Sequence, residues 1–203
     1  MWERVCALLR KWLDAGLSPL PLSVNASRYD LFRDDLVFCI TSLVQKYDIP
    51  IDLFRLEITE SAFAESTERV IDVVEQLVAY GFTVEIDDFG SGYSSLNTLK
   101  DVPANILKLD MRFLEGTRNS TRGGNIVESI VRMAKWLGMP VIAEGVETRE
   151  QADFLKSIGC FYVQGYLYNK PMPVEEYERL AADSAQENRI IKLVTLHHLD
   201  NNA

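Results

Sequence analysis

Short apolar runs alternate with stretches of apolar residues at helical spacing along the chain. Apolar residues recur every three or four positions from Trp2 to Leu13, so residues 2–15 predict an amphipathic helix, and Gly16 predicts its end. Six further runs predict strands. They are LSVN at 22–25, LFRLEIT at 53–59, FTVEIDD at 82–88, ILKLD at 106–110, MPVIAEG at 139–145 and CFYVQG at 160–165.

Helical patterns separate these strands. They are found at 34–47, 66–80, 124–138, 148–158 and 174–185. Strands that alternate with amphipathic helices at this spacing predict an α/β fold with a parallel sheet, and no linker or low-complexity stretch divides the chain. We therefore expect one domain over residues 1–185 and a C-terminal tail over 186–203.

Each predicted strand ends in a residue that can bind a metal or move a proton. These residues are Asn25, Glu57, Asp87 with Asp88, Lys108, Glu144 and Gln164. In a (β/α) barrel, all parallel strands bring their C-terminal ends to one rim, so residues that are distant in sequence meet there. The pattern therefore predicts one polar site on a TIM-type barrel.

The predicted barrel is incomplete. A TIM barrel has eight strands and about 250 residues, whereas this chain of 203 residues has about six predicted strands. The open sheet edge and the exposed core would be unfavourable unless something covers them. We expect the cover to be a second copy of the chain in a homodimer, an upstream domain, or the apolar tail IIKLVTL at 190–196, docked against the strand that carries Val24.

Composition and charge narrow the classes of ligand. A net charge of −9 and a pI near 4.8 argue against a binder of nucleic-acid polymers, because such a binder needs a basic stripe. The sequence has no apolar run of membrane-spanning length and does not open like a secretory signal. Cys6, Cys39 and Cys160 lack CxxC spacing and are typical of buried reduced thiols, so we expect a cytoplasmic protein.

The acidic residues at the strand ends favour Mg²⁺ or Mn²⁺ over zinc. Glu57, Asp87, Asp88 and Glu144 offer hard oxygen ligands, and the predicted site holds no cysteine or histidine. The adjacent carboxylates of Asp87 and Asp88 could bridge two ions, and such a pair can clamp the attacking and leaving oxygens of a phosphoryl group. Lys108 lies in an apolar strand, where an ammonium needs anionic partners.

Strand alternation also predicts an ion pair below this site. Arg55 and Glu57 share one face of their strand, and Glu85 and Asp87 share one face of the next. We therefore predict that Arg55 forms a salt bridge with Glu85 and holds that carboxylate away from the ions.

Other interpretations remain open at this point. Gly90 and Gly92 follow a strand, but Ser95 stands where a dinucleotide-binding fingerprint needs its third glycine. An enolase-like lyase also sets carboxylates and a lysine around Mg²⁺, but it would need a capping domain and a carbon acid as substrate. Taken alone, Asn25 is typical of a helix cap and Gln164 of a turn amide.

Several segments together carry a family resemblance. They are SVNAS, LEITES, IDDFGSGYSSL, ILKLD, VIAEGVET and QGYLYNKP, in this order. Over residues 2 to about 180 the chain resembles the EAL-domain phosphodiesterases, which hydrolyse cyclic di-GMP. The resemblance implies a TIM-type barrel in which two Mg²⁺ or Mn²⁺ ions activate water to cleave one phosphodiester and give linear pGpG.

The resemblance implies a metal-binding role for five residues. Asn25, Glu57 and Asp87 would bind the first ion, and Asp87 and Asp88 would hold the second. Glu144 would be the general base or a metal ligand.

It implies supporting roles for others. Lys108 would orient the nucleophilic water, while Glu147 and Gln164 would support the ligand shell. Asp110 resembles a substrate-contacting aspartate.

The loop from Phe89 to Leu96, with Ser91 and Gly92, would be anchored by Glu60 and would couple metal binding to dimerisation. The chain departs from the family because it contains no EAL triplet, whose glutamate is a metal ligand. We therefore expect an N-terminally truncated domain with impaired activity. The alternative is a catalytically inactive module that binds cyclic di-GMP or a protein partner.

Overall fold

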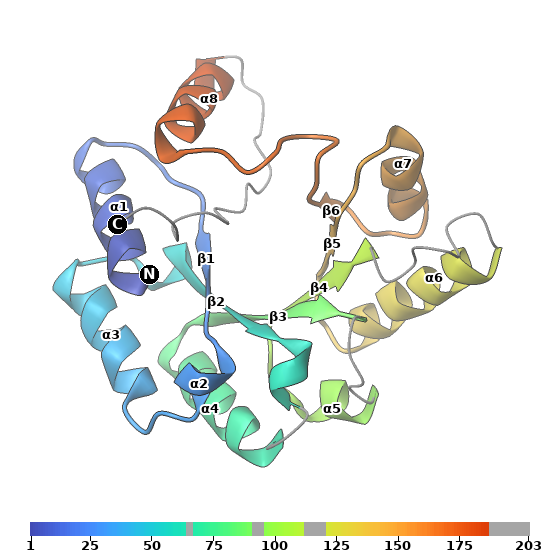
Figure 1. Ribbon diagram of the computed structural model, residues 1–203, viewed down its shortest axis with the longest axis horizontal. Coiled ribbons are helices and arrows are strands. Elements are labelled where there is room, and N and C mark those ends of the chain that lie inside the picture. The colour runs from blue at the N-terminus through green and yellow to red at the C-terminus, as the bar shows by residue number, and fades with distance from the viewer. Residues whose placement is uncertain (64–66, 91–95, 112–120, 187–203) are drawn as a thin grey trace.

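The computed structural model describes residues 1–63, 67–90, 96–111 and 121–186. Its sheet has six parallel strands in the order β1-β2-β3-β4-β5-β6. The strands are β1 (Leu22–Asn25), β2 (Phe54–Thr59), β3 (Thr83–Phe89), β4 (Ile106–Asp110), β5 (Val141–Glu144) and β6 (Tyr162–Val163). The sheet curves into a half-barrel (Figure 1), which confirms the predicted incomplete TIM-type fold.

The longer helices lie outside the curved sheet (Figure 1). They are α1 (Trp2–Asp14), α3 (Leu36–Lys46), α4 (Thr67–Tyr80), α6 (Thr121–Trp136), α7 (Arg149–Ser157) and α8 (Val174–Gln186). The short elements, which the sequence pattern did not predict, are α2 (Arg28–Leu31), α5 (Leu96–Asp101), η1 (Ile51–Leu53) and η2 (Glu60–Phe63). All six predicted helices are present, although α6 begins three residues before its predicted start.

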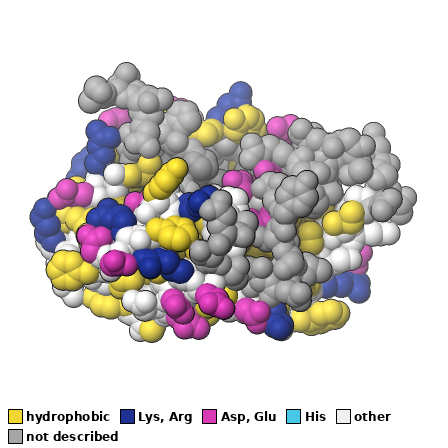
Figure 2. Space-filling model, turned by 60° about the horizontal axis from the view of Figure 1, so that its bottom comes forward, with side chains coloured by type: hydrophobic (Ala, Val, Ile, Leu, Met, Phe, Trp, Pro, Cys, Tyr) yellow, Lys and Arg dark blue, Asp and Glu magenta, His cyan; other side chains and the backbone are white. Residues whose placement is uncertain are grey.

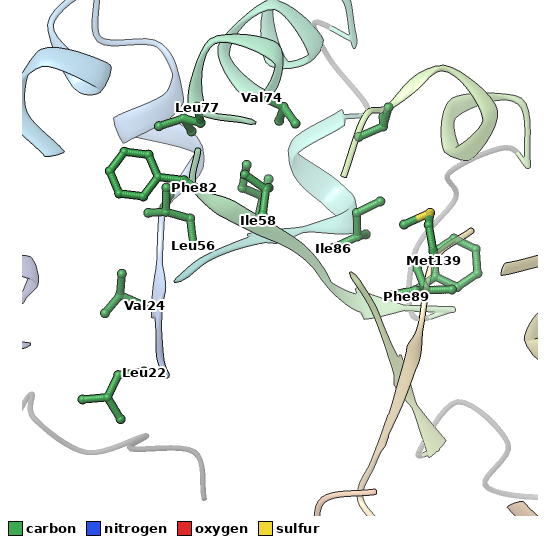
Figure 3. Close-up of a cluster of buried hydrophobic side chains, with 14 of the residues drawn as sticks. Leu22, Val24, Leu56, Ile58, Val74, Leu77, Phe82, Ile86, Phe89 and Met139 are labelled. Atoms are coloured by element: carbon green, nitrogen blue, oxygen red, sulfur yellow. The ribbon is translucent and has the colours of Figure 1, made fainter. Parts of the chain in front are cut away.

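The sheet has an apolar outer face and a polar inner face, because side chains alternate along a strand. Leu56 and Ile58 of β2 point toward Val74 and Leu77 of α4 (Figure 3). Burial of each such side chain stabilises the fold by about 1.5–3 kcal/mol. The inner face is left for polar residues, which are Ser23, Asn25, Arg55, Glu57, Glu85, Asp87, Lys108, Asp110 and Glu144.

Asn105, the residue before β4, extends the pairing of β3 with β4. Its side-chain Oδ1 accepts a hydrogen bond from the Val84 N–H at 2.8 Å, and its own N–H donates to the Val84 carbonyl at 2.8 Å. The residue therefore fixes the start of β4 beside β3 by two hydrogen bonds.

The last helix packs against the first one. The rings of Trp12 and Tyr177 have centroids 5.5 Å apart, and Trp12 Nε1 donates to Glu178 Oε1 at 2.7 Å. Lys11 Nζ lies 2.8 Å from the same oxygen. Helices α1 and α8 thus join the ends of the helix layer (Figure 1), whereas β1 and β6 form the two ends of the sheet.

The predicted cover of the β1 edge stays a prediction. Residues 190–196 lie outside the described residues, as do all but the first residue of the predicted tail at 186–203. At the end of β1, the indole Nε1 of Trp2 donates to the Asn25 carbonyl oxygen at 3.0 Å.

The thiols differ in exposure. Cys6 and Cys160 are buried, and burial raises the pKa of both, that of Cys6 to about 11. The expectation of a buried thiol is wrong for Cys39, which is partly exposed because it lies at the edge of the buried stripe of α3. Its Sγ contacts Asp35 Oδ2 at 3.3 Å.

Charges of both signs are mixed on the face shown in Figure 2, where Lys and Arg side chains lie among Asp and Glu side chains. This face therefore carries no continuous basic stripe among its described residues. None of the described helices is both long enough and apolar enough to cross a membrane.

Candidate metal and phosphodiester site

Lys108 lies at the centre of the inner face and is 2% exposed. Its Nζ is 2.6 Å from Glu57 Oε1, 3.0 Å from Asp87 Oδ1 and 2.9 Å from Glu144 Oε1. The three carboxylates come from β2, β3 and β5, on both sides of β4. Four predicted site residues therefore converge on one place, because parallel strands bring their ends to the same rim.

Burial controls the charges in this cluster. It raises the pKa of both Glu57 and Glu144 to about 7, although the nearby Lys108 ammonium acts in the opposite direction. Burial also disfavours the ammonium of Lys108, but the attraction of the surrounding carboxylates outweighs it and raises the pKa of Lys108 above its ordinary value. One ammonium faces three carboxylates, so the cluster can accept further positive charge.

A β-bulge in β3 shapes the acidic part of the rim. The register with β4 shifts between Ile86 and Phe89, and Asp88 has a positive φ of 55°. The Asp88 N–H donates to Asp87 Oδ1 at 3.0 Å. Adjacent residues of a regular strand point to opposite faces, and the bulge removes this restriction. As a result, carboxylate oxygens of Asp87, Asp88 and Glu144 lie within 4.8 Å of one another.

These three carboxylates fit Mg²⁺ or Mn²⁺, which prefer oxygen ligands. Glu144 Oε1 supports this fit: it is buried, lies 2.9 Å from Lys108 Nζ and has no hydrogen-bond partner of regular geometry among the described residues. A cation at this rim could therefore share the oxygen with Lys108. Glu57 differs from this group because its Oε1 accepts the short hydrogen bond from Lys108.

Two predicted site residues flank this group. Asn25 is exposed at the end of β1, in register with Glu57. Asp110 is 4% exposed at the end of β4, in register with Glu144. Both positions lie on the same rim, and the ligand and substrate roles of these residues stay predictions.

The connection after β6 places the Gln164 amide. Gln164 Oε1 is buried and has no hydrogen-bond partner among the described residues, so it can accept a bond from a ligand. The Gln164 carbonyl accepts from the Val146 N–H at 3.1 Å. A Cβ on Gly165 would lie 2.2 Å from the Val146 carbonyl oxygen, so only glycine allows this approach. Glu147, predicted to support the shell, is exposed.

Sequence reasoning did not find the contact of Gly165. Its signal was a glycine at the end of the predicted strand 160–165, which is typical of a close approach between backbones.

Glu60 contacts the segment that it was predicted to anchor. Its Oε2 accepts a hydrogen bond from the Gly90 N–H at 2.8 Å. Ser91 and Gly92 lie outside the described residues, so their predicted role and the coupling to dimerisation remain untested.

The predicted salt bridge below the site is confirmed. Arg55 Nη1 lies 3.2 Å from Glu85 Oε1, and the Glu85 side chain is 1% exposed. Ser23 Oγ donates to the other carboxylate oxygen, Oε2, at 3.1 Å. Sequence reasoning missed Ser23, although it shares a strand face with Asn25, two positions later.

A curved parallel sheet with carboxylates at the carboxyl ends of its strands defines the chain as a domain of the α/β-barrel class. The EAL domain family matches residues 1–171. MucR of Pseudomonas aeruginosa, a bifunctional diguanylate cyclase and cyclic di-GMP phosphodiesterase, is 36% identical over 86% of this chain and 25% of its own length. The cyclic di-GMP phosphodiesterase NbdA of the same species is 37% identical over 87% of this chain and 22% of its own length.

Solved structures agree with this relationship. The MucR phosphodiesterase in complex with cyclic di-GMP matches with a TM-score of 0.80 at 35% identity, over 87% of this chain and 71% of that one. The EAL domain of DcpA from Mycobacterium smegmatis matches with a TM-score of 0.83 at 32% identity, over 93% of this chain and 83% of that one. The chain belongs to the EAL-domain family of cyclic di-GMP phosphodiesterases. It spans about a quarter of the length of the curated relatives named here.

Proposed function

We propose that the chain carries a phosphodiesterase site that binds cyclic di-GMP and hydrolyses one phosphodiester to linear pGpG. The observation that carries this proposal is the position of Lys108, whose ammonium lies within 3.0 Å of Glu57, Asp87 and Glu144 on a rim that also holds Asp88. The complex of a relative with cyclic di-GMP supports the substrate.

Glu144 and Lys108 have the chemistry for the hydrolytic step. A carboxylate with a pKa of about 7 is suited to a general base near neutral pH, and Glu144 has this property. It would accept the proton of the attacking water as the water oxygen bonds to phosphorus and the P–O ester bond breaks, and the released ester oxygen would take up a proton from solvent. Lys108 would donate a hydrogen bond that orients this water, and the Gln164 amide would contact the ligand shell.

Asp87 and Asp88 would hold the metal, and we propose Mg²⁺ or Mn²⁺, two ions in all, with Asn25 and Glu57 as further ligands and with Glu144 as a ligand where it does not act as the base. When bound, the ions would neutralise phosphate charge and lower the pKa of a bound water. Glu60 would keep the segment that begins at Gly90 in place.

The chain contains no Glu-Ala-Leu triplet. In the family that the chain resembles, the glutamate of this triplet is a metal ligand. We therefore propose that this chain by itself binds metal weakly and has impaired turnover. The test compares hydrolysis of cyclic di-GMP by the chain alone and by the chain joined to an N-terminal segment that carries such a triplet. We expect Mn²⁺-dependent formation of pGpG to rise in the joined form, and Lys108→Met in that form to abolish it.

A non-catalytic binding module is the second candidate, and one observation favours it. Lys108 already supplies positive charge at Asp87 and Glu144, so the pocket is partly neutralised without metal. This candidate predicts that cyclic di-GMP binds in EDTA, as measured by calorimetry, and that the joined form produces no pGpG. Recovery of Mn²⁺-dependent hydrolysis in the joined form would rule it out.

A further inference from the structure

A second charged layer lies beneath the Lys108 cluster. Glu85 of β3 is the register partner of Glu57 on β2, and its side chain is 1% exposed. Arg55 Nη1 donates to Glu85 Oε1 at 3.2 Å, and Ser23 Oγ donates to Glu85 Oε2 at 3.1 Å. Both oxygens of Glu85 are therefore bound by side chains from β1 and β2, on the side of β3 that faces away from β4.

Without Arg55, the Glu85 carboxylate would compete for Lys108. Glu85 and Glu57 are neighbours on one face, and Glu57 binds Lys108 at 2.6 Å. A buried carboxylate without a counter-ion is strongly unfavourable, and an ammonium drawn toward it would lower this cost. Lys108 is the only cation among the described charged residues that are buried.

Glu85 is the hydrogen-bond partner that the described residues offer to Arg55. The Arg55 Nη1 binds Glu85, whereas its Nε is buried and has no hydrogen-bond partner among the described residues. The side chain is 23% exposed, so it lies at the margin of the buried layer and not among the site carboxylates. The geometry is that of a counter-ion for Glu85.

We propose that Arg55 is a positioning residue, because its ion pair keeps the Glu85 carboxylate away from Lys108. Lys108 then stays with the three carboxylates of the site. A displaced Lys108 would no longer orient water next to Glu144, so the loss of Arg55 would also slow hydrolysis. This expected effect on the rate rests on the proposed function. Arg55 itself touches no reacting atom.

The test follows the Lys108 ammonium directly. The full chain is labelled with ¹⁵N-lysine, and the Lys108 resonance is assigned by its loss in Lys108→Arg. We expect Arg55→Met to shift this resonance and Glu85→Gln to leave it in place. The double variant should restore the wild-type position, because a glutamine carries no charge with which to attract Lys108.

Enzyme kinetics give a second readout. They are measured on the joined form of the chain, which carries the N-terminal segment with the Glu-Ala-Leu triplet and is expected to hydrolyse cyclic di-GMP. Arg55→Met should lower kcat by roughly 10- to 100-fold, with a smaller change in KM, because misplacement of a catalytic group by about 1 Å has effects of this size. The double variant should recover most of kcat. The resonance does not depend on turnover, so an inactive wild-type chain would count against the proposed function and not against the role of Arg55.

Two results would overturn the proposal. One is an unchanged Lys108 resonance in Arg55→Met. The other is a double variant that behaves like Arg55→Met, because the loss would then come from the packing of the arginine and not from a free Glu85. If Arg55→Met does not fold, the double variant decides: a wild-type Lys108 resonance supports the proposal and a displaced one overturns it.

Arg132→Met, which removes an exposed pair with Glu128 at 2.7 Å, is the matched control and should leave the resonance unchanged.

Discussion

Two opposing effects act on the charge of Lys108. Its ammonium is almost fully buried, which is unfavourable, and it lies close to three carboxylates, which is favourable. The carboxylates are in turn buried or half-buried, and Lys108 is the cation that lies near all three of them among the described residues. Each side therefore needs the other as long as no metal is bound, and the loss of the lysine leaves several buried negative charges uncompensated.

Lys108→Met tests this dependence. In EDTA at pH 8 we expect the free energy of unfolding to fall by about 3–5 kcal/mol, because the remaining buried carboxylates lose their counter-ion. Mn²⁺ should restore part of this loss by supplying positive charge to the same oxygens. Urea unfolding followed by circular dichroism measures both effects.

Lys46→Met is the control for this experiment. Lys46 Nζ lies 2.6 Å from Glu3 Oε1, but both side chains are more than half exposed. We expect a change below about 1 kcal/mol. Equal losses of unfolding free energy in the two variants would show that the Lys108 cluster contributes no more to stability than an exposed ion pair.

At this scale, sequence could predict which residues meet but not how they bind one another. Alternation and the common rim of parallel strands placed Glu57, Asp87 and Glu144 together and paired Arg55 with Glu85. The three ion pairs of Lys108 depend on strand tilt and side-chain rotamers, and the sequence pattern carries neither. The same holds for Cys39, because one residue of rotation on a helix decides between burial and exposure.

At the level of elements, the bulge in β3 decides how many carboxylates the rim can offer. Two adjacent aspartates in a regular strand would direct only one side chain to the inner face. With Asp88 at a positive φ, both reach the group that includes Glu144. Asparagine and aspartate tolerate this backbone conformation better than most other residues.

Asp88→Asn separates the bulge from the charge of its side chain. Asparagine keeps the backbone conformation, so we expect the unfolding midpoint in urea to stay within error of the wild type. Mn²⁺ affinity should fall at least about tenfold, because an amide replaces a charged ligand. Calorimetric titration with Mn²⁺ gives the affinity.

Asp48→Asn is a matched control for this substitution. Asp48 also has a positive φ, of 48°, and its side chain is exposed. It should change neither stability nor Mn²⁺ affinity. If Asp88→Asn bound Mn²⁺ as tightly as this control, Asp88 would not be a ligand.

The segments that follow β5 and β6 lie close together at Gly165 and Val146. Gly165→Ala would place a Cβ against the Val146 backbone, so the two connections must separate and Gln164 must move. We expect a loss of about 1–3 kcal/mol in unfolding free energy and weaker binding of cyclic di-GMP in calorimetry.

Gly138→Ala serves as its control. Gly138 has a positive φ of 74°, but a Cβ there would meet nothing within 4 Å. It should therefore lose only the small backbone contribution and bind cyclic di-GMP normally. Similar binding by both variants would contradict the positioning of Gln164 by this contact.

Periodicity was a good guide to the long elements and a poor one to the short ones. The strands β1 to β5 and the six long helices carry enough repeats of their pattern to be read from sequence, whereas β6 has two residues and was predicted from the longer run CFYVQG. Helix α2 has four residues and α5 has six, too few for a repeat. For α2 the capping box of Ser27 and Asp30 was the available signal. The bulge left no signal, since two adjacent aspartates fit a regular strand equally well.

For the whole molecule, the buried carboxylates couple stability to pH. Glu57 and Glu144 have folded-state pKa values of about 7, above the ordinary 4.5. Between these values the folded chain binds more protons than the unfolded chain, so the free energy of unfolding must decrease as pH rises. Well above pH 7 both groups are ionised in the folded and the unfolded chain, so they no longer change the free energy of unfolding with pH.

Urea unfolding in EDTA from pH 5 to 8 measures this dependence. We expect stability to fall across the window in the wild type and to fall less in Glu57→Gln and Glu144→Gln, which cannot release the proton. Stability that rises through the window would contradict the raised pKa values. Salt should have little effect on the slope, because buried charges are weakly screened.

Metal binding should show the opposite trend. A cation requires ionised carboxylates, so Mn²⁺ affinity should increase up to about pH 7 and then level off, by at most about tenfold per pH unit for each proton released. Calorimetry in two buffers with different ionisation enthalpies counts the protons released. An affinity that is flat from pH 5 to 7 would mean that neither glutamate takes part.

The contact between the first and last helices has a consequence for synthesis on the ribosome. Trp12 and Glu178 are 166 positions apart, and Trp12 is 3% exposed in the folded chain. At typical elongation rates, roughly 10–30 s separate the two residues. During this interval the indole of the nascent chain lacks its final partner, which makes the emerging α1 a natural target for chaperones that recognise exposed aromatic side chains.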